Sequence, residues 1–279
     1  MPDSLLCLLQ YDVAGTGRSR THEYYQTLME ANAAYCRQVA SGCRLWQERR
    51  DDTRWPPYWK KVMMTYHALM HGVGGERCSR VLWLDRDAVV TNANATFSFS
   101  NTMTIGLESA RTCSRRGCNM RFFFNAGVYV IQNSDIGQAI AKEWTLLYDQ
   151  AESSWRRVNA STGQHWSCSD CTWSGDKYEQ GSFARSVLPK WQDDIRTCTT
   201  DDTANGTGAK APVAWTRRTS CRWHYSTWDC DEAARQQVQH FVVGTGGSVR
   251  EHVMRLWIKQ CLRPESGLGL SHQRTMGFN

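Results

Sequence analysis

Short apolar runs alternate with longer amphipathic segments along the first ninety residues. Residues 5–10 (LLCLLQ) form an apolar run of strand length, and apolar side chains recur at helical spacing over residues 21–41. A short run at 43–46, a second helical pattern at 59–70 and an apolar run at 81–84 follow. Strands that alternate with helices at this spacing are typical of parallel βαβ units, so the pattern predicts an α/β fold.

The second half of the chain is less regular. Residues 121–132 read as a strand that is interrupted at 125–127 (Asn-Ala-Gly), because glycine inside a strand often marks a bulge. Residues 152–178 read as loops, and no clear element stands out between 190 and 231. The remaining predicted elements are helices at 134–151, 178–188 and 249–263 and a strand at 240–244.

Composition narrows the class of protein. The chain has 279 residues, of which 41% are hydrophobic and 22% charged, and this fits a single domain with a substantial core. The net charge of +6 is scattered in short clusters, without the basic stripe or recognisable module expected of a nucleic-acid-binding protein. A weakly positive face suits a small anionic substrate such as a nucleotide phosphate. The sequence contains no run of about 18 apolar residues, so it predicts no membrane span in this chain.

Twelve cysteines allow two interpretations. A zinc site needs two close pairs of ligands, but only Cys168 and Cys171 form a CxxC motif. Disulfides in an oxidising compartment are the other interpretation. Three N-x-[ST] sequons, at Asn94, Asn159 and Asn205, favour the second, and so we expect a lumenal or secreted setting.

The segment VLWLDRDAVVTN, residues 81–92, carries the candidate chemistry. An apolar strand ends in Asp85 and Asp87, at the edge of a parallel sheet where ligands bind. Two carboxylates in a turn can face one hard divalent cation, which often completes its shell with substrate phosphates. The plain alternative is an aspartate pair that caps a turn. A second alternative is a haloacid-dehalogenase-type phosphatase, in which Asp85 is the nucleophile and Asp87 the acid/base, although that motif normally opens its domain.

Four blocks of sequence carry a resemblance to a known family. They are YYQTLMEANAAYC, WKKVMM, VLWLDRDAVVTN and FFFNAGVYVIQNSDIGQAIAKEW, followed by the weaker echoes YEQGSF and HFVVG. In this order they resemble glycosyltransferase family 34, a group of α-galactosyl-, mannosyl- and xylosyltransferases of the GT-A type. The resemblance implies a GT-A-like fold, with a mixed, mostly parallel sheet flanked by helices. It further implies one domain over 1–279, with a Rossmann-like nucleotide-binding half at 1–92 and a sugar- and acceptor-binding half at 93–279. The Cys- and Trp-rich excursion at 152–232 matches nothing in the family.

The same resemblance implies a metal site. Asp85, Asp87 and His240 would hold Mn²⁺, or Mg²⁺ in its place, on the diphosphate of a UDP- or GDP-sugar. Lys61, or its neighbour Lys60, would add a positive charge to the same phosphate oxygens. A lysine on an amphipathic helix is otherwise expected to face solvent.

Other residues are expected to contact the donor. Tyr11 and Asp12 end the first predicted strand and are placed to meet the base and ribose. In the resemblance, Asn125 and Gly127 line the donor sugar. Glu179 and Gln180 would lie near the anomeric carbon, although this chain has glutamate where the family has aspartate. We therefore list the catalytic candidates as Asn125, Glu179 and Gln180.

The sequence thus predicts a metal-dependent glycosyltransferase that moves a hexose or pentose to a glycan or glycoprotein acceptor, with retention at the anomeric carbon. The alternatives are the phosphatase and a carbohydrate-binding protein that has lost turnover. The start MPDSLLCLLQYD lacks the features of a signal peptide. We expect this chain to be the catalytic part of a longer, membrane-anchored product in the secretory lumen, in the Golgi.

Overall fold

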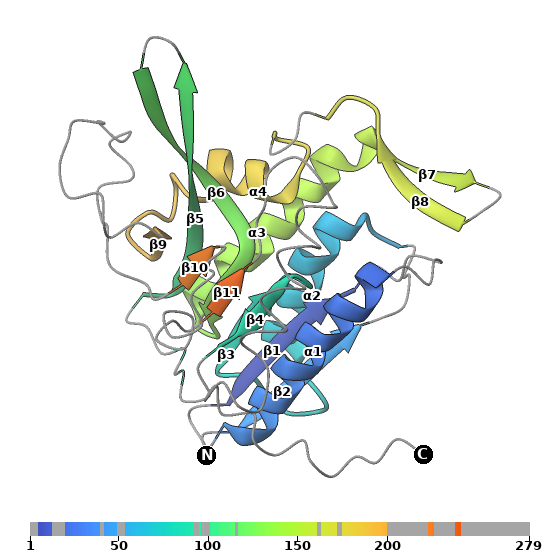
Figure 1. Cartoon of the computed structure of the whole chain (residues 1–279). Coiled ribbons are helices and arrows are strands. Elements are labelled where there is room, and N and C mark those ends of the chain that lie inside the picture. The colour runs from blue at the N-terminus through green and yellow to red at the C-terminus, as the bar shows by residue number, and fades with distance from the viewer. Residues whose placement is uncertain are drawn as a thin grey trace.

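A six-stranded sheet lies at the centre of the molecule (Figure 1). The computed structural model of the chain describes residues 5–12, 20–39, 42–48, 54–91, 95, 97, 101–114, 117–160, 163–171, 175–199, 223–225 and 238–240. The sheet strands are β1 (Leu6–Tyr11), β2 (Cys43–Glu48), β3 (Arg80–Leu84), β5 (Met103–Ser114), β6 (Gly117–Gln132) and β9 (Ile195–Thr199).

The strand directions make the sheet mixed. The order is β2-β1-β3-β6-β5-β9. Strand β1 runs parallel to both β2 and β3, and β5 runs parallel to β9, whereas β6 is antiparallel to β3 and β5. The predicted α/β fold with a mostly parallel sheet flanked by helices is therefore confirmed.

Two hydrophobic cores form because successive strand residues point to opposite faces of the sheet. On one face, Leu6 and Leu8 of β1 join a cluster that includes Tyr35 of α1 (Arg20–Gln38). On the other face, Cys7 and Leu9 join a larger cluster built from α2 (Pro57–His71) and α3 (Asp135–Ala151). Helix α1 thus covers one face, and α2 and α3 cover the other (Figure 1).

Three short strands form a second, smaller sheet next to the central one. They are β4 (Ala88–Val90), β11 (Val238–His240) and β10 (Trp223–Tyr225), in the order β10-β11-β4. Strand β4 follows the aspartate pair directly, and β11 runs antiparallel to it. This sheet brings the end of the described chain back to the aspartates.

Several predicted elements are confirmed, and one region is different. The strands and helices predicted between residues 5 and 84, and the helix at 134–151, are present within a few residues of their predicted ends. The region 152–178 is not only loops, because η1 (Glu152–Ser154) leads into a hairpin of β7 (Trp155–Ala160) and β8 (Gly163–Cys168). These two strands pair with each other outside the central sheet, so their sequences carry no strong core-facing alternation.

The predicted helix at 178–188 begins as α4 (Glu179–Ser182) and widens into the π-helical turn η2 (Phe183–Val187). The predicted strand at 240–244 overlaps β11 only at His240, and residues 241–244 lie outside the described part. The predicted helix at 249–263 also lies outside it. Within the described ranges, no helix is long and apolar enough to cross a membrane.

Disulfides tie the N-terminal strands and α1 together. Cys7 of β1 bonds to Cys78, and Cys36 at the end of α1 bonds to Cys43 at the start of β2. The CxxC motif is also a disulfide, Cys168–Cys171, and no cysteine is free among the described residues. The disulfide interpretation is therefore confirmed for these six cysteines, and the zinc interpretation of the CxxC motif is wrong.

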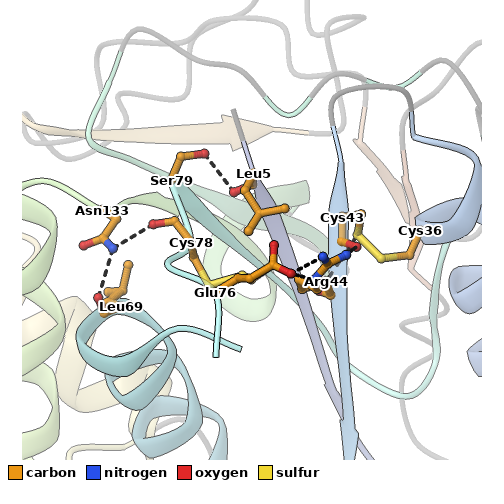
Figure 2. Close-up of a disulfide and its surroundings, with 10 residues drawn as sticks. Leu5, Cys36, Cys43, Arg44, Leu69, Glu76, Cys78, Ser79 and Asn133 are labelled. Carbon is orange, nitrogen blue, oxygen red and sulfur yellow. Dashed lines mark hydrogen bonds and ion pairs between the residues drawn. A yellow bond between two sulfur atoms is a disulfide. The ribbon is translucent and has the colours of Figure 1, made fainter. Parts of the chain in front are cut away.

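The Cys7–Cys78 bridge lies in a network that fixes the entry to β3 (Figure 2). Asn133 donates from Nδ2 to the carbonyl oxygens of Leu69 and Cys78, at 2.9 and 2.7 Å, and Ser79 Oγ donates to the carbonyl of Leu5 at 2.8 Å. These bonds join the end of α2, the start of β3 and the end of β6 at one point.

Removal of the Cys7–Cys78 bridge is expected to cost more stability than removal of Cys36–Cys43. The first bridge spans 71 residues and the second only 7, and a longer closed loop restricts the unfolded chain more. We expect Cys7→Ala/Cys78→Ala to lower the free energy of unfolding by about 4 kcal/mol and Cys36→Ala/Cys43→Ala by about 2 kcal/mol, measured by urea denaturation. Equal losses for the two double variants would contradict this expectation.

Candidate active site at the strand ends

The candidate site forms where β1 and β3 end. Asp12 follows the last residue of β1, and Asp85 follows the last residue of β3. The antiparallel strand β6 passes this point, since Leu84 pairs with Val128. The backbone N–H of Asp85 donates to the carbonyl of Gly127 at 2.7 Å, which fixes the aspartate against β6.

A bulge in β6 shapes this contact. Pairing with β5 jumps from Ile105 opposite Tyr129 to Gly106 opposite Asn125, so three residues of β6 have no counterpart in β5. The side-chain Oδ1 of Asn125 accepts from the N–H of Gly127 at 2.7 Å and closes the turn. The strand break predicted at residues 125–127 is therefore confirmed.

Lys61 of α2 lies at the centre of the site. Its Nζ is 2.9 Å from Oδ1 of Asp85 and 3.2 Å from Oε1 of Glu179, and it donates to the carbonyl of Ala126 at 3.3 Å. The Lys61 side chain is only 6% exposed. Burial alone would lower the pKa of Lys61, but Asp85 and Glu179 raise it above its usual range, so the ammonium stays charged.

Glu179 is deeply buried beside Lys61. Its side chain is 2% exposed, and its Oε2 has no hydrogen-bond partner among the described residues. Burial raises the pKa of Glu179, Lys61 opposes that rise, and Asp85 adds to it. Gln180, the next residue of α4, is half-buried.

Three tryptophan indoles hold the segment that carries Glu179. Trp144 Nε1 donates to the carbonyl of Glu179 at 2.8 Å. Trp59 Nε1 and Trp155 Nε1 both donate to the carbonyl of Lys177, at 3.0 and 2.9 Å. The sequence did not indicate these three hydrogen bonds, because their acceptors are backbone atoms distant in the chain.

The aspartate turn is braced from both sides. Trp83 Nε1 donates to Oδ1 of Asp85 at 2.7 Å. Arg86, between the two aspartates, donates from Nη1 to Oδ1 of the buried Asp12 at 3.3 Å and lies 4.1 Å from the centre of the Tyr25 ring. Asp12 is thus engaged by Arg86, a contact that the sequence did not suggest.

Asn32 of α1 braces the other side of the turn. It is fully buried, donates from Nδ2 to the carbonyl of Ala88 at 2.9 Å and accepts at Oδ1 from the N–H of Val90 at 2.8 Å. Asp87 directly precedes this strand, β4, and is 6% exposed. Because Asn32 bonds to both the Ala88 carbonyl and the Val90 N–H, it fixes the direction of the chain after the aspartate turn.

The two neighbouring lysines have different partners. Lys60 Nζ pairs with Oε1 of Glu48 at 2.7 Å and lies 4.3 Å from the centre of the Tyr11 ring. The structure therefore assigns Lys61, and not Lys60, to Asp85. Tyr11 is buried, with Lys60 over its ring.

The backbone is compatible with the predicted metal ligands. His240 pairs with Ala88 in the antiparallel ladder of β11 and β4, so its backbone lies beside the residue that follows Asp87. Carboxylate oxygens with an imidazole form a donor set that suits Mn²⁺. The side chain of His240 is outside the described part, and the described side chains include no cluster of three metal-ligating groups.

Comparison with solved structures supports the fold. A glycosyltransferase involved in the glycosylation of the major capsid of PBCV-1 matches with a TM-score of 0.53 at 13% identity, over 91% of this chain and 99% of that one. GlyE of Streptococcus pneumoniae TIGR4 gives 0.38 at 12% identity, over 92% and 64%. Mouse xyloside xylosyltransferase 1 gives 0.39 at 10% identity, over 87% and 99%.

At this level of identity, the first match shows a shared fold and the other two are too distant to add to it. No family model matches the chain, and no curated protein matches it by sequence. The resemblance to family 34 therefore stays a prediction.

The charge of Lys61 is expected to stabilise the fold through Glu179. Lys61→Met leaves Glu179 buried without its charged partner, so we expect the free energy of unfolding to fall by about 3 kcal/mol at neutral pH. The double variant Lys61→Met/Glu179→Gln removes both charges and should recover much of that loss. Urea denaturation of the three proteins measures this, and a double variant no more stable than Lys61→Met would count against the buried ion pair.

Proposed function

We propose that the chain is a metal-dependent glycosyltransferase. It transfers a hexose or pentose from a UDP- or GDP-sugar to a glycan or glycoprotein acceptor, with retention at the anomeric carbon. One observation carries the proposal: the buried ammonium of Lys61 contacts Asp85 at the strand ends of a GT-A-like fold, two residues before Asp87. Strand ends are where open α/β sheets bind their ligands.

The proposed cation is Mn²⁺ or Mg²⁺. Asp87, His240 and Asp85 would hold it, with Asp87 the first choice because the Asp85 carboxylate already contacts Lys61 and Trp83. When bound, the ion neutralises the charge that develops on the leaving nucleoside diphosphate.

The residues of the chain itself would then bind and orient the donor. Lys61 supplies a positive charge for the phosphates, in a site where burial makes that charge effective. Tyr11 and Asp12 lie at the adjoining strand end, on the side proposed for the base and ribose. The turn at Asn125 and Gly127 offers polar groups to the donor sugar, and Glu179 and Gln180 begin the helix α4 next to Lys61.

The geometry favours transfer over the phosphatase alternative. A phosphatase of that type needs Asp85 as a nucleophile. Here Oδ1 of Asp85 is bonded to Trp83 and Lys61, and Oδ2 accepts from Lys61 at 3.3 Å. These bonds occupy both oxygens of the carboxylate that would have to act as the nucleophile.

We place the chain in the secretory lumen as part of the same proposal. Its disulfides support this compartment, because disulfides persist in oxidising environments and are rare in the cytosol.

Asp87→Asn tests the proposed cation site without a change in side-chain size. We expect UDP or GDP to raise the melting temperature of the wild-type protein only when Mn²⁺ is present, because a ligand that binds the folded state stabilises it. Asp87→Asn should lose this shift and its transfer activity.

Asp176→Asn is the control, since Asp176 is an exposed residue that pairs with Arg185. It should behave as the wild type. A nucleotide shift that needs no metal would contradict the proposal, as would normal transfer by Asp87→Asn. Phosphate release from a general phosphomonoester would favour the phosphatase instead.

A further inference from the structure

We infer that Lys61 competes with the divalent cation for Asp85, and that Glu179 is the anchor that keeps the Lys61 ammonium in place when the cation binds. The inference rests on the proposed function, because it assumes a cation at the aspartate pair. It assigns Glu179 a positioning role through Lys61, which differs from a role at the anomeric carbon.

Asp85 is already occupied by hydrogen-bond donors. Its Oδ1 lies 2.9 Å from Lys61 Nζ and accepts from Trp83 Nε1 at 2.7 Å, and its Oδ2 is 3.3 Å from the same ammonium. The side chain is nevertheless 30% exposed, so a cation can reach it from solvent. An ammonium this close to the ligand oxygen repels a divalent cation strongly, because like charges at short range in a partly buried site are poorly screened. Asp85 can therefore ligate the cation fully only if Lys61 moves away from it.

Glu179 offers the ammonium an alternative partner. Its Oε1 is already 3.2 Å from Lys61 Nζ, and its buried Oε2 has no hydrogen-bond partner among the described residues. The Ala126 carbonyl, 3.3 Å away, is a further acceptor. An ammonium that leaves Asp85 thus keeps two of its contacts and gains access to an unused carboxylate oxygen, so it need not be expelled to solvent.

Glu179 is held well enough to act as an anchor. Its carbonyl accepts from Trp144 Nε1 at 2.8 Å and from Ser182 Oγ at 2.9 Å, so its backbone is fixed at the start of α4. Lys61, in contrast, reaches the site on a flexible four-carbon side chain. A small rotation of that side chain is therefore the simplest change that releases Asp85.

The competition has a consequence for binding order. Without donor, Lys61 weakens binding of the cation, because Asp85 must give up its ammonium. A donor diphosphate supplies further oxygens to the cation and adds negative charge near the Lys61 ammonium, so the two ligands bind cooperatively, and the coupling is reciprocal. Lys61 thus makes the cation bind well only together with a diphosphate.

A titration with Mn²⁺, in the absence and presence of UDP or GDP, measures this competition. Isothermal calorimetry on folded protein reports the dissociation constant directly, without any enzyme assay. The informative variant is Lys61→Met/Glu179→Gln, which removes one charge of each sign and keeps the local net charge of the wild type. We expect it to bind Mn²⁺ alone about tenfold more tightly than the wild type, and to show a smaller gain on addition of nucleotide.

Two further variants separate the inference from a general structural effect. Glu179→Gln alone leaves Lys61 on Asp85 without its anchor, and we expect weaker Mn²⁺ binding than in the wild type. Lys60→Met is the matched control, because Lys60 is the adjacent buried lysine and pairs with Glu48. It should leave the Mn²⁺ affinity unchanged. Thermal unfolding confirms that each variant is folded.

The outcomes are distinct. Equal Mn²⁺ affinity in the wild type and in Lys61→Met/Glu179→Gln would overturn the inference and leave the proposed function intact. Failure of the wild type to bind Mn²⁺ even with UDP and GDP would contradict the proposed function itself, and the inference with it.

Discussion

The buried ammonium of Lys61 is the interaction on which the arrangement of the site depends. A charge that is 6% exposed is tolerated only when opposite charges and hydrogen-bond acceptors surround it. Asp85 after β3, Glu179 of α4 and the Ala126 carbonyl in the bulge of β6 meet that requirement. One side chain of α2 thereby fixes three elements that the rest of the chain connects by long routes.

The surrounding structure keeps this ion cluster in place by fixing backbone atoms. The bulge at residues 125–127 turns one carbonyl of β6 toward Lys61 and another toward the N–H of Asp85. Trp144 fixes the carbonyl of Glu179, and Asn32 fixes the carbonyl of Ala88 and the N–H of Val90 in the strand after Asp87. Most of these contacts are hydrogen bonds from side chains to the backbone, and they define where the charged groups can lie.

Sequence patterns predicted the parts of the molecule in which periodicity and local chemistry agree. The strands that end at Tyr11 and Leu84 were recognised from continuous apolar runs, and the bulge from a glycine in a strand. The hairpin at 155–168 was missed because its strands pair outside the central sheet. The choice between Lys60 and Lys61 was also open in the sequence, since both lie on the same helix, and tertiary contacts with Glu48 and Asp85 distinguish them. The burial of Glu179 could not be predicted either, because it also depends on tertiary contacts, those with Lys61 and Trp144.

Crystals soaked with Mn²⁺ and UDP or GDP, with diffraction data collected at the manganese absorption edge, test the central claim most directly. The account predicts an anomalous peak bound to Asp87, a diphosphate on the peak, and the Lys61 ammonium moved from Asp85 toward Glu179. Density without a peak at the aspartate pair, with Lys61 still bonded to Asp85, would contradict it.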